Sequence, residues 1–502
     1  MHVLIYIKAD QIRIANIWFD MVQNLRIADL VGVIVAKFGG SALGVHGSLL
    51  PSVIERIRQL MEEAKIVAVF SAPIIKYDEK NVSMTDVALS KGKSFASTQP
   101  TDLQVLRNVY DVLSSNYLDS VCKKEFTDLL NSFFHEVTVS LKQAAENRRF
   151  VDVVRSRTLA YSGEIPMSYL MDYVLRSSGF KSGHVSITHW PIITDDNFEG
   201  ANFSLEDSRR SISSLLDLIE NNEVVTMGGF IGKTTDGLET TYERGGSDRT
   251  AADIAILLND KYDVRIDFEK DGAVQSADPK VVKNELHYVT HLSYNEARLA
   301  GMFGMKILDP VAIKEIDDNG LDIPITVTDM SSPSRFTIIK RKLPNDGDEN
   351  LIKIVTGKKN CAIVRMDSVS ASHLLAMLEK VREYHEFVKL SPYRVDDLEI
   401  SRILFLDAEF IRRNERYFRA YSSKVDIIYQ RGVVTMIGDN MWKSPRIASL
   451  ASSTVGEHGI NILNLDAQEE TSRILIIVED SGNSVNSAIS AIHSQRPKFH
   501  GK

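Results

Sequence analysis

The sequence has few cysteines and lacks any long apolar run. Among its 502 residues only Cys122 and Cys361 are cysteines, which excludes a disulfide framework and fits a reducing compartment, the cytoplasm. Neither has a His or Cys neighbour at metal-ligand spacing, so we interpret both as packed thiols and predict no protein metal site. No uninterrupted apolar stretch approaches the about 20 residues of a membrane-spanning helix.

The sequence also has fewer basic residues than acidic residues, 59 against 67. The net charge of −8 argues against a general binder of nucleic acid or of membrane surfaces. A hydrophobic fraction of 44% and a charged fraction of 25% are ordinary for a globular protein. Residues 1–30 carry too many charges for the core of a signal peptide. We predict an N-terminal extension there and assign it no function.

The most informative stretch runs from residue 224 to residue 258. Its apolar start, Val224–Met227, predicts a buried strand, and Gly228, Gly229 and Gly232 follow. The block 244–248 contains the cation of Arg244, the hydroxyl of Ser247 and the carboxylate of Asp248. After it, the apolar residues have the spacing of a helix. Glycine-rich turns also serve as plain connectors. However, a strand that leads through glycines into a helix start favours an anion, because free backbone N–H groups and the helix dipole face it.

A second candidate site follows the first predicted strand, 32–36. Lys37, Gly39 and Gly40 come directly after this strand, where open α/β sheets place their ligands. The lysine precedes the glycines, so the pattern is not Walker A. Strands alternate with helices over about 300 residues, which predicts a parallel, doubly wound α/β sheet.

The pattern changes near residue 350. Shorter strands surround two amphipathic helices, about 371–384 and 445–457, which predicts two small α+β modules of the βαββαβ type. The predicted domains are an extension (1–30), an α/β domain (31–340) and two modules (350–430 and 431–485). In the second module a strand–Gly–Asp turn, Gly438-Asp439, faces a strand start at Asn461-Ile462. We interpret these four residues as a binding site for a small amino acid.

These stretches together resemble the aspartate kinases, members of the amino acid kinase family with C-terminal ACT domains, over about residues 31–480. The matching blocks occur in that family's order: Lys37-Phe38-Gly39-Gly40-Ser41, Ser71-Ala72 with Thr85-Asp86, Ser162-Gly163-Glu164, Gly229-Phe230-Ile231-Gly232, Arg244-Gly245-Gly246-Ser247-Asp248, Ser276-Ala277-Asp278-Pro279-Lys280 and Phe303-Gly304-Met305-Lys306-Ile307-Leu308-Asp309-Pro310. One block alone would be a weak signal, but their shared order makes the resemblance specific.

The resemblance implies phosphoryl transfer from ATP to the β-carboxylate of L-aspartate, giving 4-phospho-L-aspartate, the first step toward lysine, threonine and methionine. Mg²⁺ is the implied cofactor, as for phosphoryl transfer generally. The implied catalytic residues are Lys37, Asp248 and Lys306. Implied substrate contacts are Ser41, Thr85, Glu164, Arg244, Gly245, Gly246 and Ser247. Implied nucleotide contacts are Lys37, Gly39, Gly40, Gly229, Gly232, Glu269, Lys270, Lys280 and Lys306.

The resemblance also implies a homodimer or a higher homo-oligomer, because ACT modules usually pair their sheets between subunits. A possible amino-acid effector is implied by the modules, whereas no nucleic acid or membrane partner is expected. Only a short segment follows the ACT-like region, so we expect no fused homoserine dehydrogenase.

The sequence departs from the family pattern at several positions. Ala42 replaces a Ser or Thr, Arg249 an aromatic residue and Asp309 a His. The loop usually written Thr-Asp-Val-Asp-Gly-Val-Tyr reads Glu269-Lys270-Asp271-Gly272-Ala273-Val274-Gln275. It therefore lacks the Tyr and Thr expected to contact the adenosine half of the nucleotide.

Two alternatives to aspartate kinase remain open. One is an amino acid kinase that acts on another acyl group, such as glutamate or carbamate. The other is a non-catalytic amino-acid sensor that kept the effector modules, which the altered loop 269–275 favours. Retention of Lys37, Glu164, Asp248 and Lys306 together speaks against the sensor.

Overall fold

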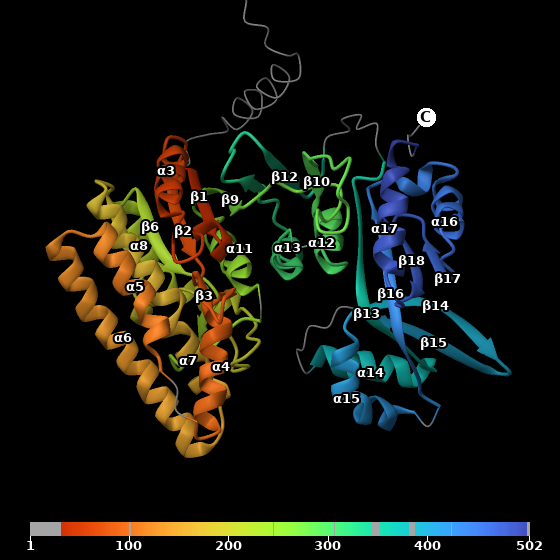
Figure 1. Ribbon diagram of the computed structural model, residues 1–502, viewed down its shortest axis with the longest axis horizontal. Helices are drawn as coiled ribbons and strands as arrows, with labels where there is room; N and C mark the ends of the chain where they lie inside the picture. Colours follow the sequence, from red (N-terminus) through yellow and green to blue (C-terminus); the bar gives the residue numbers. More distant parts are fainter. Residues whose placement is uncertain are drawn as a thin grey trace, which may run out of the picture.

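The computed structural model describes residues 32–99, 102–243, 245–305, 307–343, 351–380, 387–422 and 424–498. The predicted extension 1–30, Arg244 and Lys306 therefore lie outside the described residues. Two bodies lie side by side, one built on a mostly parallel sheet and one on an antiparallel sheet (Figure 1). No helix within the described ranges is both long enough and apolar enough to cross a membrane.

An eight-stranded sheet forms the core of the first body, in the order β10-β12-β11-β9-β1-β2-β6-β5. Neighbouring strands are parallel except β11 and β12, which are antiparallel. The strands are β1 (Gly32–Phe38), β2 (Lys65–Phe70), β5 (Ser182–His184), β6 (Val224–Gly228), β9 (Asp263–Lys270), β10 (His291–Ser293), β11 (Ile325–Asp329) and β12 (Phe336–Lys340). The predicted parallel, doubly wound α/β sheet is confirmed.

Helices cover this sheet on both faces. They are α2 (Gly40–Leu43), α3 (Leu50–Met61), α4 (Met84–Ala96), α5 (Gln104–Tyr117), α6 (Ser120–Asn147), α7 (Asp152–Ser162), α8 (Glu164–Ser177), α9 (Leu205–Ser211), α10 (Ser213–Asn221), α11 (Gly246–Leu258), α12 (Tyr294–Met302) and α13 (Pro310–Asp318). Two hairpins add β3 (Ile74–Tyr77) with β4 (Lys80–Ser83), and β7 (Ile231–Lys233) with β8 (Glu239–Thr241).

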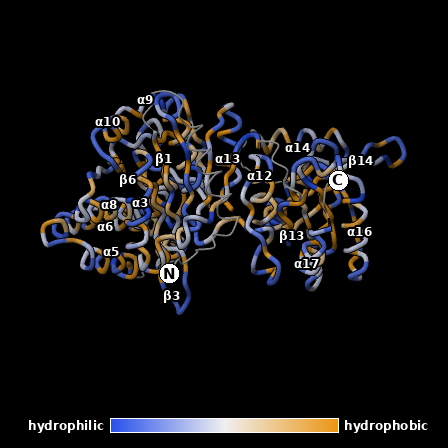
Figure 2. Tube along the Cα trace, turned by 90° about the horizontal axis from the view of Figure 1, so that it is seen from above, coloured by the Kyte–Doolittle hydropathy of each residue, from blue (hydrophilic) through white to orange (hydrophobic). Residues whose placement is uncertain are grey.

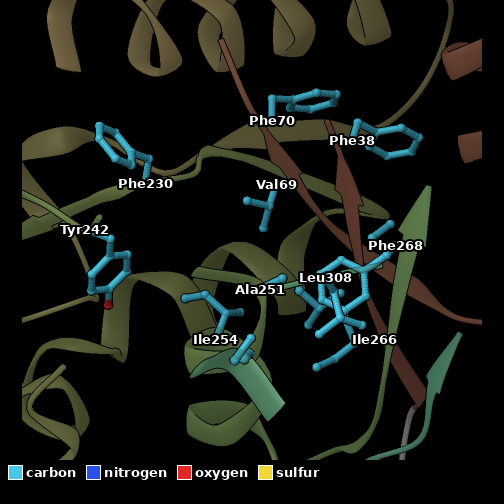
Figure 3. Close-up of a cluster of buried hydrophobic side chains, with 14 of the residues drawn as sticks. Phe38, Val69, Phe70, Phe230, Tyr242, Ala251, Ile254, Ile266, Phe268 and Leu308 are labelled. Atoms are coloured by element: carbon cyan, nitrogen blue, oxygen red, sulfur yellow. The ribbon is translucent and has the colours of Figure 1, made fainter. Parts of the chain in front are cut away.

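The side chains of the central strands alternate between the two faces. Phe38 and Phe70 stack on one face, with ring centroids 5.4 Å apart, and the buried helix α11 packs on the other (Figure 3). The small side chains Ala251 and Ala252 of α11 are fully buried, which lets this helix lie close to β1 and β9. Because side chains alternate along a strand with a period of two, this alternation determines which charged residues near the strand ends face α11.

The second body is a six-stranded antiparallel sheet in the order β14-β15-β13-β16-β18-β17. Its strands are β13 (Ile354–Asp367), β14 (Phe387–Val395), β15 (Leu398–Phe405), β16 (Asp426–Ile437), β17 (Ile462–Ala467) and β18 (Arg473–Glu479). Its helices are α14 (Ser368–Lys380), α15 (Ala408–Tyr421), α16 (Ile447–Glu457) and α17 (Ser484–Ser494). This antiparallel arrangement confirms the two predicted α+β, ACT-like modules.

The two modules share their central strands. One apolar cluster includes Leu374 of α14 and Phe418 of α15, and another includes Val455 of α16 and Ile489 of α17. The long strands β13 and β16 contribute to both clusters, so the predicted boundary at 430/431 falls inside β16. Hydrophobic residues, drawn in orange, occur throughout the interior of both bodies (Figure 2).

Candidate active site

The site is built around Asp248, in the first turn of α11. Lys37, at the end of β1, places its ammonium Nζ 2.8 Å from Asp248 Oδ1. Lys270, the last residue of β9, places its Nζ 3.5 Å from Asp248 Oδ2. The backbone N–H of Asp309 also donates to Oδ2, at 3.1 Å. Two neighbouring strand ends and one helix start therefore meet at a single carboxylate.

Asp248 and Lys37 are nearly buried, with exposed fractions of 5% and 7%. Burial alone would raise the pKa of Asp248, but the positive charges of Lys270 and Lys37 outweigh it and lower that pKa to about 2. The carboxylate is therefore ionised at neutral pH. It holds two ammonium groups at the edge of the sheet where parallel strands end, which is where α/β folds bind ligands.

Glycines line this part of the sheet edge. A Cβ atom built on Gly39 would lie 3.1 Å from Lys37 Nζ, and one on Gly40 would lie 3.0 Å from the carbonyl oxygen of Ala72. A Cβ on Gly229 would lie 2.6 Å from Ser247 Cβ. These close approaches leave backbone without side chains around the lysines, which suits a polyanionic ligand.

Glu164 carries a second buried carboxyl group that matters for the site. It begins α8, is 4% exposed, and its Oε2 has no hydrogen-bond partner among the described residues. A Cβ on Gly228 would lie 3.2 Å from Glu164 Cβ, so Glu164 lies beside the end of β6. Burial raises the pKa of Glu164 to about 7, although backbone hydrogen bonds and the charge of Lys37 partly oppose this.

The other predicted substrate contacts lie on neighbouring elements. Ser41 and Thr85 are half-buried on α2 and α4, and Ser247 is buried in the first turn of α11. Gly246 begins α11, and a Cβ there would lie 2.3 Å from Tyr242 Cβ. Gly245 caps the helix at φ +98°, a left-handed conformation that favours glycine. Arg244 and Lys306 lie outside the described residues, so their predicted roles stay predictions.

Three residues that are predicted to contact the nucleotide do not lie beside Asp248. Glu269 points to the opposite face of β9, where Arg56 Nε of α3 donates to its Oε1 at 2.6 Å. Gly232 packs tightly in the β7–β8 hairpin, because a Cβ there would lie 2.4 Å from Thr194 Cγ2. Lys280 is exposed, in a loop whose residue Ala277 packs into the second module.

One predicted effector residue, Asp439, takes part in a contact between the two bodies. The backbone N–H of Asp439 donates to Glu296 Oε1 of α12 at 2.7 Å. Lys353 Nζ donates to Glu296 Oε2 at 2.8 Å. Asp439 also lines a cavity of about 300 Å³, whose other lining residues do not include Asn461 or Ile462. The amino-acid site at Gly438, Asp439, Asn461 and Ile462 stays a prediction.

Sequence reasoning did not identify the roles of Arg56, Glu296 and Lys353. Glu296 carries one local signal, because Ser293 and Glu296 have the spacing of a capping box, which the structure shows. The same carboxyl group also serves the second body, and no local pattern reveals that. Arg56 reaches Asp267 and Glu269 from a distant helix, which spacing in the sequence does not show.

Comparisons with known proteins agree with this architecture. A bifunctional aspartokinase/homoserine dehydrogenase of Buchnera aphidicola is 22% identical over 91% of the chain and 56% of that protein. An aspartokinase of Helicobacter pylori is 24% identical over 63% of the chain and 78% of that protein. The chain spans about half the length of the bifunctional relatives it matches.

Solved structures show the same fold over nearly the whole chain. The structure of E. coli aspartokinase III in complex with aspartate and ADP has a TM-score of 0.74 and 17% identity, covering 92% of this chain and 99% of that one. The structure of Clostridium acetobutylicum aspartate kinase has a TM-score of 0.62 and 20% identity, with the same coverage. The model of the amino acid kinase family matches residues 32–329. The chain therefore belongs to the amino acid kinase family.

Proposed function

We propose that this protein is an aspartate kinase, which transfers the γ-phosphoryl group of ATP to the β-carboxylate of L-aspartate. The observation that carries the proposal is the pair of lysines on Asp248, Lys37 buried and Lys270 half-buried, beside the glycines at the ends of β1 and β6. The names of the relatives support the choice of aspartate as the acceptor.

The chemistry needs charge neutralisation more than proton transfer. The β-carboxylate of aspartate has a pKa near 3.9 in solution, so it is already ionised at neutral pH. One of its oxygens forms a bond to the γ-phosphorus, and the bond from that phosphorus to the bridging oxygen breaks. The bonding electron pair leaves with ADP, and 4-phospho-L-aspartate is released. An anion thus attacks a polyanion, and catalysis rests on positioning and electrostatics.

Lys37 is placed to supply this neutralisation. Its ammonium group lies at the strand end, beside Gly39, and Asp248 fixes its position through the 2.8 Å ion pair. Because the site is nearly buried, the charge of Lys37 is screened by water less than at the surface. We propose that Lys37 contacts the transferring phosphoryl group and that Asp248 orients Lys37. By the resemblance, Lys306 acts with them.

Mg²⁺ is proposed as the metal that accompanies ATP. The described part of the chain has no cluster of three His, Cys, Asp or Glu side chains that could hold a metal ion. Both oxygens of Asp248 already face lysines, which makes Asp248 a poor direct ligand. The residues present therefore fit a metal carried by the phosphates of the nucleotide, as is usual for Mg²⁺.

Glu164 is proposed to bind the ammonium group of aspartate. Its unpartnered Oε2 and its position beside β6 leave an acceptor for a cationic group. Arg244 is proposed for the α-carboxylate, because the guanidinium fork matches the two oxygens of a carboxylate. Ser41, Thr85 and Ser247 are proposed to complete the contacts with aspartate.

The test is ADP release by the purified protein with Mg-ATP, with and without L-aspartate, while hydroxylamine traps the acyl phosphate. Aspartate-dependent hydroxamate supports the proposal. Hydroxamate with glutamate instead would overturn the choice of acceptor, and carbamate-dependent ADP release would do the same. Binding of amino acids without any turnover would identify a sensor. Repeating a positive assay with lysine, threonine and methionine then tests for an effector, and light scattering tests the predicted homo-oligomer.

A further inference from the structure

We propose that Lys270 is a second cation for the phosphate chain of the nucleotide, so that Lys37 and Lys270 bind it from two adjacent strands. This inference rests on the proposed function, because it assigns a residue to the nucleotide site of that reaction. The resemblance implies only a nucleotide contact at this position, where the family pattern has Asp; the role of a lysine on the phosphates is argued here from the structure.

The strand register places Lys270 beside the glycine turn. Strands β1 and β9 are parallel, and their last aligned pair joins Phe38 to Glu269. Lys270 is one step beyond that pair, level with Gly39. Side chains alternate along a strand, so Lys270 shares the face of Phe268 and Lys37 and turns toward α11. Glu269 turns the other way, where Arg56 binds it, and does not compete for the Lys270 ammonium.

The charges around Asp248 do not balance. One ionised carboxylate faces two ammonium groups, at 2.8 Å and 3.5 Å. Two further carboxyl groups act on this site, Asp309 on Asp248 and Glu164 on Lys37. Burial raises the pKa of each to about 7, so both are only partly ionised at neutral pH. Asp271 also attracts Lys270, but it is exposed to solvent. Among the described residues, Asp248 is the carboxylate that contacts both lysines, and it cannot balance two positive charges by itself.

A buried net charge is costly unless a counter-charge joins it. Phosphate oxygens are the natural partners, because an ammonium group forms short, strong hydrogen bonds with them. The 3.5 Å separation from Asp248 is longer than a strong charge-assisted hydrogen bond, so Lys270 retains donor capacity for a ligand. Lys37 and Lys270 approach from different strands and thus provide two separate contacts along one phosphate chain.

The competing explanation is that Lys270 only holds Asp248 in place. The two explanations differ in what Lys270→Met does to a ligand that has phosphates but no nucleoside and no acceptor. We therefore choose tripolyphosphate as the probe and titration calorimetry on the full chain as the measurement. Lys270→Arg keeps the charge. Lys261→Met is the matched control, because Lys261 is exposed, pairs with Glu220, and lies just before the other end of β9.

Lys270→Met is expected to weaken tripolyphosphate binding by about 10- to 100-fold, the scale of one lost hydrogen bond between charged groups. Lys270→Arg should retain most of the affinity, and Lys261→Met should match the wild type. A melting temperature for each variant shows whether it is folded. Unchanged affinity in a folded Lys270→Met variant would overturn the proposal, and so would an equal loss in Lys261→Met.

The two proposals fail in different ways. If the wild type binds tripolyphosphate through Lys270 but makes no aspartyl hydroxamate, the acceptor is wrong and the role of Lys270 stands. If hydroxamate forms and Lys270→Met lowers kcat without changing tripolyphosphate affinity or the KM for ATP, Lys270 only positions Asp248. In that case the proposed function stands and this inference is overturned.

Discussion

Lys37 Nζ lies 2.8 Å from Asp248 Oδ1, and this ion pair ties the end of β1 to the first turn of α11. Both residues are nearly buried. A buried ion pair gains little net stability, because each charge loses its hydration. The arrangement is therefore better explained by ligand binding than by stability: Asp248 holds a lysine in place at a strand end.

Lys37→Ala is expected to lower kcat by at least about 100-fold, the scale of losing one electrostatic contact to the transition state. The readout is the hydroxamate assay at saturating ATP and aspartate. Lys65→Ala is the control, because Lys65 begins β2 and so lies at the other end of the strands from the site. Its Nζ donates to the carbonyl oxygen of Ile219. A kcat within a few-fold of the wild type in Lys37→Ala would contradict the assigned role.

Glu164 predicts a pH dependence of aspartate binding. Burial raises the pKa of Glu164 to about 7, so the carboxyl group is mostly protonated below that pH and cannot attract an ammonium group. The KM for aspartate is therefore expected to fall as the pH rises through about 7. Glu164→Gln should show a high KM that lacks this transition. A wild-type KM that is flat between pH 6 and pH 8 would argue against an ammonium contact.

The same raised pKa makes an independent prediction for stability. The folded state favours the protonated form, so Glu164 stabilises the fold below its ordinary pKa of 4.5, and this contribution is lost as the pH rises toward 7. Glu164→Gln removes the charge and should melt at a higher temperature than the wild type at pH 8, with a smaller difference at pH 5. Thermal melts at both values test the sign. A variant that is less stable at pH 8 would show that the ionised carboxylate is well solvated.

Much of the site could be predicted from the sequence, because short-range patterns position it. The pattern of an apolar strand that ends in a lysine and glycines indicates the position of Lys37. The strand–glycine–helix pattern indicates the position of Asp248. The orientation of Glu269 and Lys270 depends on which face of β9 meets α11, and the partner Arg56 comes from a distant helix. Likewise, the backbone N–H of Asp439 binds Glu296 in the other body, a contact that the pattern around Asp439 does not indicate. Contacts between distant segments of this kind have no signature in local spacing.

Gly229→Ala is expected to disrupt the site, because the added methyl group would lie 2.6 Å from Ser247 Cβ, with backbone rather than a flexible chain end nearby. Ser247 precedes Asp248, so the first turn of α11 would shift and carry the carboxylate with it. We expect a drop in kcat/KM of at least about 10-fold, consistent with small misplacements in catalytic geometry. Gly456→Ala in α16 is the control, because nothing lies within 4 Å of its added Cβ. Wild-type activity in Gly229→Ala would mean that the turn tolerates the shift.

We expect a strong energetic coupling between Glu296 and Lys353, which form an ion pair between the two bodies. Glu296 is fully buried in α12, and its Oε2 accepts from Lys353 Nζ at 2.8 Å, while its Oε1 accepts from the backbone of Asp439. Removing one partner leaves the other charge buried and unpaired, which costs about 3–5 kcal/mol. Glu296→Gln and Lys353→Met should each lower the free energy of unfolding on this scale.

The double variant should lose much less than the sum of the single losses, because neither charge is then left without its partner. Denaturant unfolding of the four proteins gives the coupling energy, which we expect to exceed about 1 kcal/mol. Asp317 and Arg341 form an ion pair of similar length, 2.7 Å, but with side chains 52% and 34% exposed. The double-mutant cycle of this exposed pair should give a clearly smaller coupling energy than the cycle of Glu296 and Lys353, as is usual for surface pairs. Equal coupling in the two cycles would mean that water reaches Glu296, and that the second body is held to α12 by its apolar contacts rather than by this buried charge.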